Sequence, residues 1–277
     1  MYYVFIKGKE EINMDRIEIK GKVNTAICYA KVVENEAIEQ IRRMCDYPMT
    51  EGAKIRIMPD VHSGKGCTIG TTMTIKDRVV PNVVGVDIGC GMYTVCLGKG
   101  EIDFAKVDEA AHFIPSGGNV WEGRIEKFDL TKLKCYRKLK DTRRLERSLG
   151  TLGGGNHFIE IDEASDGNKY LIIHSGSRNL GKQVADYYQN LAIDLDKGLE
   201  TYFVAREELI KTYKEQGRRK EIQQALKELE KTRYENEPQN PEDLCYLYGK
   251  YMEDYLFDVE ICQNFAKRNR EKMAEII

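Results

Sequence analysis

Hydrophobic and polar positions follow two different periods along the chain, and the period changes near residue 181. In the first part, short apolar runs with β-like alternation predict strands. One stretch differs, because Ala37, Ile38, Ile41 and Cys45 recur at helical spacing and predict a helix over 34–45. The predicted strands cover residues 2–6, 15–20, 24–31, 54–58, 67–75, 83–87, 92–97, 157–162 and 170–174, with a loop over 59–66.

After residue 181 the apolar residues recur every three or four positions, which predicts amphipathic helices. We expect one long helix over 181–214, another over 218–235 and a last one that begins after Pro241, since proline suits a first helical turn. Strands followed by helices indicate an α+β fold with mixed sheets and long helices in the C-terminal third. The apolar face of the last helix would hold Leu244, Tyr248, Tyr251, Tyr255, Val259, Cys262 and Ala266.

Glycine usage adds tight loops to this picture. Residues 52–181 contain 19 of the 24 glycines, which predicts sharp backbone turns at the ends of the strands. We expect a single domain over residues 1–277, with a core at 52–181 and a helical cover at 182–277, because the candidate site residues described below span 87–174 and the flanks supply cover.

Composition excludes several classes of protein. The chain has 43 basic and 45 acidic side chains, so a globally basic nucleic-acid coat is not expected. It contains no apolar run of the roughly 20 residues that a membrane helix needs, and its start does not resemble a signal peptide. Eight scattered cysteines without a CxxC pair fit reduced thiols. We expect a cytoplasmic protein with no membrane partner.

One segment departs from this near-neutral balance. Residues 132–147 carry eight basic and two acidic side chains, a local charge of +6. Such a segment is either a phosphate-binding face or a solvated amphipathic helix.

Candidate metal ligands lie at the ends of predicted strands. Asp87 and Cys90 are three residues apart among glycines, and His157 and His174 lie in two further glycine-rich segments. A carboxylate, a thiolate and two imidazoles form a ligand set for a divalent metal such as Mn, Fe, Co or Zn, and for two metals if the thiolate bridges them. We expect these strand ends to meet in one metal cleft.

Two of these segments also have the features of anion sites. Gly153, Gly154 and Gly155 expose backbone N–H groups, and the Ser-Gly-Ser-Arg run that ends at Arg178 opens a predicted helix. Phe158 and Glu160 alternate onto one strand face, where a ring and a carboxylate would suit a purine, guanine especially. From the residues alone, the sequence predicts a metal-dependent phosphoryl or nucleotidyl enzyme.

Four of the segments together resemble the RtcB family of RNA ligases. They are Pro-Asp-Val-His at 59–62, Gly-Val-Asp-Ile-Gly-Cys-Gly-Met at 85–92, Gly-Gly-Asn-His-Phe-Ile-Glu at 154–160 and His-Ser-Gly-Ser-Arg at 174–178. The Ala-Lys-Arg-Asn-Arg run at 266–270 resembles a helical segment of the same family.

The resemblance implies a GTP- and Mn(II)-dependent ligase that joins RNA 3′-phosphate or 2′,3′-cyclic phosphate ends to 5′-hydroxyl ends, through a guanylylated histidine. It implies two metal sites, one of them incomplete here, with Cys90 as the bridging ligand. Its further implied site residues are the catalytic carboxylate Asp60, the GTP-site residues Asn156, Phe158 and Glu160, and the RNA-phosphate contact Arg178.

One departure from the family pattern changes the expectation for this chain. The nucleophilic histidine of the family lies in a late His-Gly-Ala-Gly-Arg string, and no histidine follows His174 here. We therefore expect a C-terminally truncated chain that is inactive alone. A natural short form that needs an accessory or C-terminal partner chain, and a degenerate copy of the gene product, are the other interpretations of this departure. Two alternatives stay open: a non-catalytic or regulatory short form that binds RNA ends, and a metal-dependent phosphoesterase.

Overall fold

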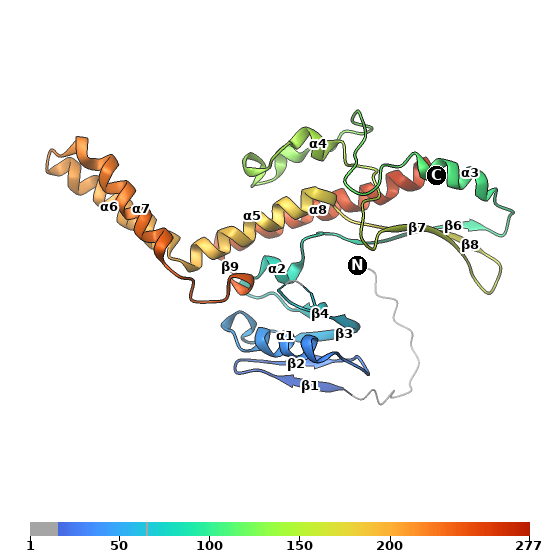
Figure 1. Cartoon of the computed structure of the whole chain (residues 1–277), viewed down its shortest axis with the longest axis horizontal. Coiled ribbons are helices and arrows are strands. Elements are labelled where there is room, and N and C mark those ends of the chain that lie inside the picture. Colours follow the sequence, from blue (N-terminus) through green and yellow to red (C-terminus); the bar gives the residue numbers. More distant parts are fainter. Residues whose placement is uncertain (1–15, 65) are drawn as a thin grey trace. The chain divides into compact units, whose positions relative to one another are not determined.

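The structure is a computed structural model that describes residues 16–64 and 66–277 (Figure 1). The strand expected over residues 2–6 lies outside the described residues. The chain divides into two compact units, which meet in sequence between Lys76 and Asp77. Helices and mixed sheets occur together, which confirms the α+β class. That residues 1–277 form a single domain stays a prediction.

The N-terminal unit is a four-stranded sheet with a helix. Its elements are β1 (Ile17–Lys20), β2 (Thr25–Cys28), α1 (Asn35–Cys45), β3 (Ile55–His62) and β4 (Ile69–Met73). β2 and β3 are parallel, and α1 makes the crossover that parallel neighbours need. The strand order is β1-β2-β3-β4, and the two outer pairings are antiparallel. Ala37, Ile41 and Cys45 are buried on α1, which confirms its predicted apolar face.

The predicted loop at 59–66 is wrong at its start, because β3 continues to His62. His62 pairs with Ile69 of β4 across an irregularity in the ladder, and Pro59 lies within that irregular stretch. A proline is tolerated in a strand at such a break, because it cannot donate a ladder hydrogen bond.

The C-terminal unit contains an antiparallel sheet in the order β6-β8-β7. The strands are β6 (Gly91–Gly98), β7 (Phe158–Glu163) and β8 (Lys169–Ser175). A separate two-stranded sheet pairs β5 (Arg78–Val79) with β9 (Leu247–Tyr248). One face of the sheet is apolar: Leu171 and Ile173 of β8 are buried with Met273. The register places Met92, His174 and Phe158 side by side on the opposite face.

Helices make up most of the rest of this unit. They are α2 (Pro81–Val84), α3 (Phe104–His112), α4 (Thr142–Glu146), α5 (Arg178–Asp196), α6 (Leu199–Glu215), α7 (Ile222–Glu235) and α8 (Gly249–Ile276). The largest core lies between α5 and α8, where the rings of Tyr188 and Tyr255 are 5.0 Å apart. No helix in the described part of the chain combines the length and apolar character needed to cross a membrane.

Three expected elements of this unit are wrong. No strand forms at 83–87, because Pro81 opens the short helix α2 instead. The helix expected over 181–214 is two helices, since Gly198 adopts a left-handed φ of 92° between them. The last helix begins at Gly249, because Leu247 and Tyr248 pair with β5. Leu244 and Tyr248 therefore do not lie on its apolar face.

Candidate metal centre

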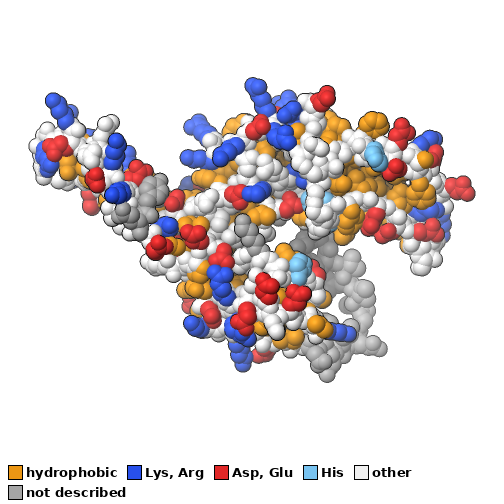
Figure 2. Space-filling view, in the orientation of Figure 1, with side chains coloured by type: hydrophobic (Ala, Val, Ile, Leu, Met, Phe, Trp, Pro, Cys, Tyr) orange, Lys and Arg blue, Asp and Glu red, His pale blue; other side chains and the backbone are white. Residues whose placement is uncertain are grey.

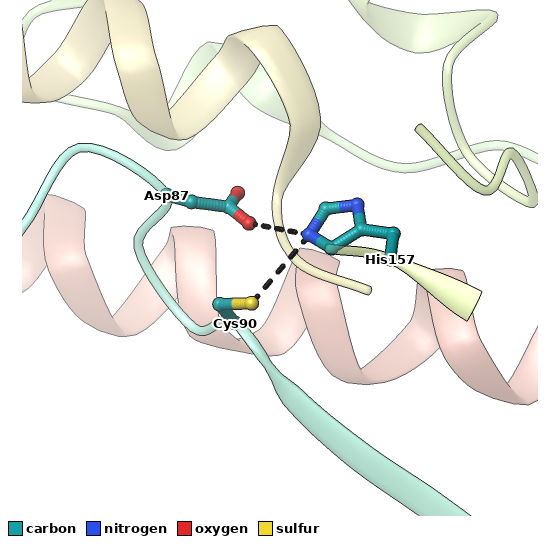
Figure 3. A group of neighbouring side chains, drawn as sticks. All are labelled: Asp87, Cys90 and His157. Atoms are coloured by element: carbon teal, nitrogen blue, oxygen red, sulfur yellow. Dashed lines mark hydrogen bonds and ion pairs between the residues drawn. The ribbon is translucent and has the colours of Figure 1, made fainter. Parts of the chain in front are cut away.

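The loop between α2 and β6 presents Asp87 and Cys90 to the same point (Figure 3). The Cys90 N–H donates to the Asp87 carbonyl at 3.0 Å, which closes the turn between them. Gly89 has a left-handed φ of 78°, and a side chain there would crowd Ala266 of α8. The loop thus folds tightly against the helix, with the carboxylate and the thiol on the same side.

His157 completes a group of three candidate ligands. Its Nε2 lies 3.0 Å from the Asp87 carboxylate and 3.5 Å from the Cys90 Sγ, and the ligand atoms of all three residues lie within 4.8 Å of one another. His157 Nδ1–H donates to the Leu152 carbonyl at 2.9 Å. Because a carbonyl only accepts, this bond assigns a hydrogen to Nδ1 and leaves Nε2 as the ring atom that faces the other two ligands. Three electron-pair donors converging on one point fit a shared cation.

His174 reaches the same thiol from the neighbouring strand. Its Nε2 is 3.3 Å from the Cys90 Sγ, and the His157 and His174 rings are 5.4 Å apart. The thiol therefore lies within reach of both imidazoles. A second site that shares Cys90 stays a prediction.

The state of the Cys90 thiol depends on its surroundings. The residue is exposed, but partial burial of its thiol, followed by the nearby Asp87 carboxylate, raises the pKa of Cys90 to about 12. The thiol is therefore protonated near neutral pH, and a bound divalent cation would stabilise the thiolate instead.

A cationic pocket of about 600 Å³ lies beside the three ligands. Asp87 and His157 line it together with Arg144, Arg178 and Lys182. A pocket that joins a metal-ligand group to three cationic side chains suits a phosphate-bearing ligand. Asn156 lines the same pocket, and its role in a nucleotide site stays a prediction.

Arg178 is held in place inside this pocket. It is the first residue of α5, and its φ of 61° is unusual for a residue with a side chain. Its Nε donates to the Thr151 hydroxyl at 3.1 Å and its Nη2 to the Gly117 carbonyl at 2.6 Å. Burial lowers the pKa of Arg178, although the guanidinium still stays charged.

The remaining predicted site residues lie in two places. The Phe158 ring meets the His174 ring edge-on at 5.3 Å, and the exposed Glu160 shares its sheet face two residues along β7. Asp60 is an exposed residue of β3 in the N-terminal unit. The roles of all three stay predictions.

Two residues of α8 organise the site, and sequence reasoning assigned them no role. The buried Asn269 amide accepts from Gly150 N and Thr151 N, at 2.7 and 3.0 Å, and donates to the Gly176 carbonyl. Arg270 Nη1 donates to the carbonyls of Gly89 and Ser175, at 2.8 and 2.6 Å. Together they fasten three loops of the site to one helix. The sequence does contain a signal for them, because Asn269 and Arg270 are polar residues on the otherwise apolar face of the last helix.

Gly176→Ala is expected to weaken metal binding without removing a ligand. A Cβ at this position would overlap the Asp87 carboxylate, which must then leave its present position beside His157. Displaced metal-site geometry typically costs about 10–100-fold in affinity. Titration calorimetry with Mn(II) measures this loss. Gly91→Ala is the matched control, since open space surrounds its added Cβ, and equal affinities in the two variants would contradict the assignment.

A carboxylate, a thiol and an imidazole gathered beside a cationic pocket define a candidate metal-binding protein with a pocket suited to phosphate-bearing ligands. The sequence profile of the family described as tRNA-splicing ligase RtcB matches residues 40–117 and 120–277. The chain belongs to the RtcB family, which confirms the resemblance in the motifs.

Individual relatives agree with this assignment. The chain is 30% identical over 269 residues to the RNA-splicing ligase RtcB of Escherichia coli strain K12, an alignment that covers 88% of this chain and 57% of that protein. It is 27% identical over 227 residues to the tRNA-splicing ligase RtcB of Archaeoglobus fulgidus, with coverages of 62% and 46%. The chain thus spans about half the length of these curated relatives.

Proposed function

We propose that this chain supplies the metal- and GTP-binding part of an RNA ligase that joins 3′-phosphate or 2′,3′-cyclic phosphate ends to 5′-hydroxyl ends. The observation that carries the proposal is the convergence of Asp87, Cys90 and His157 beside a cationic pocket that Asp87 and His157 line. Membership of a family named for tRNA splicing and ligation gives the reaction class. The substrates are then RNA ends, such as tRNA halves or broken RNA.

The residues present fit a Mn(II) site. Asp87, Cys90 and His157 would hold the first ion, and His174 would hold a second ion through Cys90. A bound divalent ion would neutralise phosphate charge in the pocket. Mn(II) accepts carboxylate ligands readily, and Cys90 would bind it as the thiolate that a bound cation stabilises.

The other side chains would bind the nucleotide and the RNA. We assign Phe158 to stacking on the guanine and Glu160 to accepting its N–H donors, because both lie on the His174 face of the sheet. Asn156 would contact GTP from the pocket, and the guanidinium of Arg178 would bind an RNA phosphate there. Asp60 would act as a catalytic carboxylate.

Incubation with Mn(II) and α-labelled GTP is expected to give a chain that binds the metal but carries no label on a denaturing gel. The family attaches GMP to a late histidine, and these 277 residues contain none after His174. Metal binding is measured in the same sample by the loss of the free Mn(II) paramagnetic resonance signal. Label retained on the protein would contradict the expected inactivity, and absence of bound Mn(II) would contradict the metal assignment.

A parallel incubation separates ligation from phosphate-ester hydrolysis. Single-stranded RNA with a 3′-phosphate is mixed with the chain and Mn(II), without GTP. We expect no inorganic phosphate to be released. Metal-dependent release that Cys90→Ala abolishes would replace the ligase proposal with a phosphoesterase.

A further inference from the structure

The basic segment, residues 132–147, is not a continuous amphipathic helix. It consists of short 3₁₀ turns at 130–132 and 136–138 followed by α4. Its apolar side chains Leu133, Cys135 and Leu145 are buried in the core of the C-terminal unit. The exposed cations are Lys132, Lys134, Arg137, Lys138, Lys140, Arg143 and Arg144.

The backbone of the basic segment is fastened to two helices of its unit. Lys134 N and Cys135 N donate to the buried carboxylate of Asp258 on α8, at 2.7 and 3.0 Å. Lys140 N donates to the Gln183 side chain on α5 at 2.7 Å, and Gln183 returns a bond to the Lys140 carbonyl. The cations are therefore carried on a backbone that is already fixed by hydrogen bonds. Less conformational entropy is lost when such a segment binds a ligand.

Much of this positive charge lacks a counter-charge. Within the described residues, no ion pair includes Arg137, Lys138, Lys140 or Arg143. The two acidic residues of the segment do not pair with these four cations: Asp141 caps α4 and Glu146 pairs with Arg124. Uncompensated cations on a protein of net charge −2 form a local attractive surface for a polyanion.

The basic segment runs into the cationic pocket of the metal centre. Arg144 belongs to both, and its Nη2 donates to the Gly118 carbonyl in the wall of that pocket. Lysine and arginine side chains gather over α4 in the space-filling view (Figure 2). A nucleic-acid strand with its end in the pocket would therefore meet this surface next.

We propose that the basic segment binds the sugar–phosphate backbone of the RNA strand whose end lies at the metal centre. This inference rests on the proposed function. The contacts are charge-assisted and do not read bases, so binding is independent of sequence and weakens with salt. The metal centre recognises the end of the strand, and the basic segment holds the nucleotides that precede it.

The test replaces Arg137, Lys138, Lys140 and Arg143 together with glutamine. None of the four lines the metal pocket, so Mn(II) affinity is expected to stay unchanged. The control replaces four exposed cations of the α6–α7 region with glutamine, at the same change in net charge: Lys211, Lys214, Arg219 and Lys220. The probe is a fluorescein-labelled single-stranded RNA with a 3′-phosphate, titrated by anisotropy at several salt concentrations with Mn(II) present.

We expect the basic-segment variant to bind this RNA at least about tenfold more weakly at low salt. Each lost phosphate contact lowers the salt slope of a single strand by about 0.7, so four lost contacts make it shallower by about 3. The control should match the wild-type chain in affinity and slope. Equal binding by wild type and the basic-segment variant overturns the inference, and so does an equal loss in the control.

An RNA with a 3′-hydroxyl separates this inference from the proposed function. If the wild-type chain does not prefer the 3′-phosphate but the basic-segment variant still loses affinity, the proposed function fails and the backbone surface stands. If the preference is present and the variant binds as wild type does, the surface fails and the function stands. Absence of any RNA binding by the wild-type chain overturns the surface.

Discussion

Cys90→Ala is expected to lower the affinity of the chain for Mn(II) at least about 100-fold, since changing groups that merely orient ligands already costs 10–100-fold. Cys90 is the one ligand within reach of both imidazoles, at 3.5 Å from His157 and 3.3 Å from His174. Its removal therefore damages both predicted ion positions at once. Loss of Asp87 or His157 would leave the Cys90–His174 contact in place.

Titration calorimetry with Mn(II) measures this loss, and a Co(II)-loaded sample identifies the ligand atom. A thiolate bound to Co(II) gives a sulfur-to-metal absorption band, which should be present in the wild-type chain and absent from Cys90→Ala. Cys96→Ala is the matched control, because Cys96 is also an exposed cysteine but lies away from the ligand group. A wild-type affinity in Cys90→Ala, or an equal loss in Cys96→Ala, would contradict the assignment.

The ligand group could be predicted from the sequence because local signals place it. Asp87, Cys90 and His157 each follow or precede a strand within a glycine-rich stretch, and glycine lets neighbouring backbone segments approach closely. Alternation along β7 placed Phe158 and Glu160 on one face, and the register with β8 confirms this. These inferences needed only the alternation of side chains along a strand and the chemistry of those side chains.

The parts that could not be predicted depend on tertiary contacts. Asn269 and Arg270 act on backbone groups about 90 to 180 positions earlier in the chain, and no local pattern specifies those partners. The apolar periodicity continues on both sides of Gly198 and favoured one helix, whereas its left-handed backbone separates α5 from α6. β9 forms because it pairs with β5, which is distant in sequence. Leu247 and Tyr248 are therefore strand residues, although the local pattern predicted a helix there.

Asp258 provides the second large expected effect, on stability rather than on metal binding. Its side chain is fully buried on α8 and accepts three hydrogen bonds, from Lys134 N, Cys135 N and the Tyr188 hydroxyl at 2.7, 3.0 and 2.9 Å. Burial, followed by the charge of Asp258, raises the pKa of Tyr188 well above its usual range. The phenol therefore stays a donor at neutral and moderately alkaline pH. This carboxylate joins α8, α5 and the start of the basic segment.

Asp258→Ala is expected to lower the free energy of unfolding by about 3–5 kcal/mol, because it leaves two backbone N–H groups and a buried phenol without an acceptor. Tyr188→Phe removes only one of the three bonds and should cost about 1 kcal/mol. Asp254→Ala is the matched control on the same helix: its carboxylate pairs with the exposed Lys250, so its cost should stay within about 0.5 kcal/mol.

Urea denaturation followed by the fluorescence of Trp121 measures these differences, since the single tryptophan of the chain lies in the C-terminal unit. The critical result is the order of the three losses in free energy of unfolding, because each loss depends on how many donors the substitution leaves unpaired. A cost for Asp258→Ala no larger than that of Tyr188→Phe would mean that the backbone donors find other acceptors. The carboxylate would then not hold the basic segment on α8.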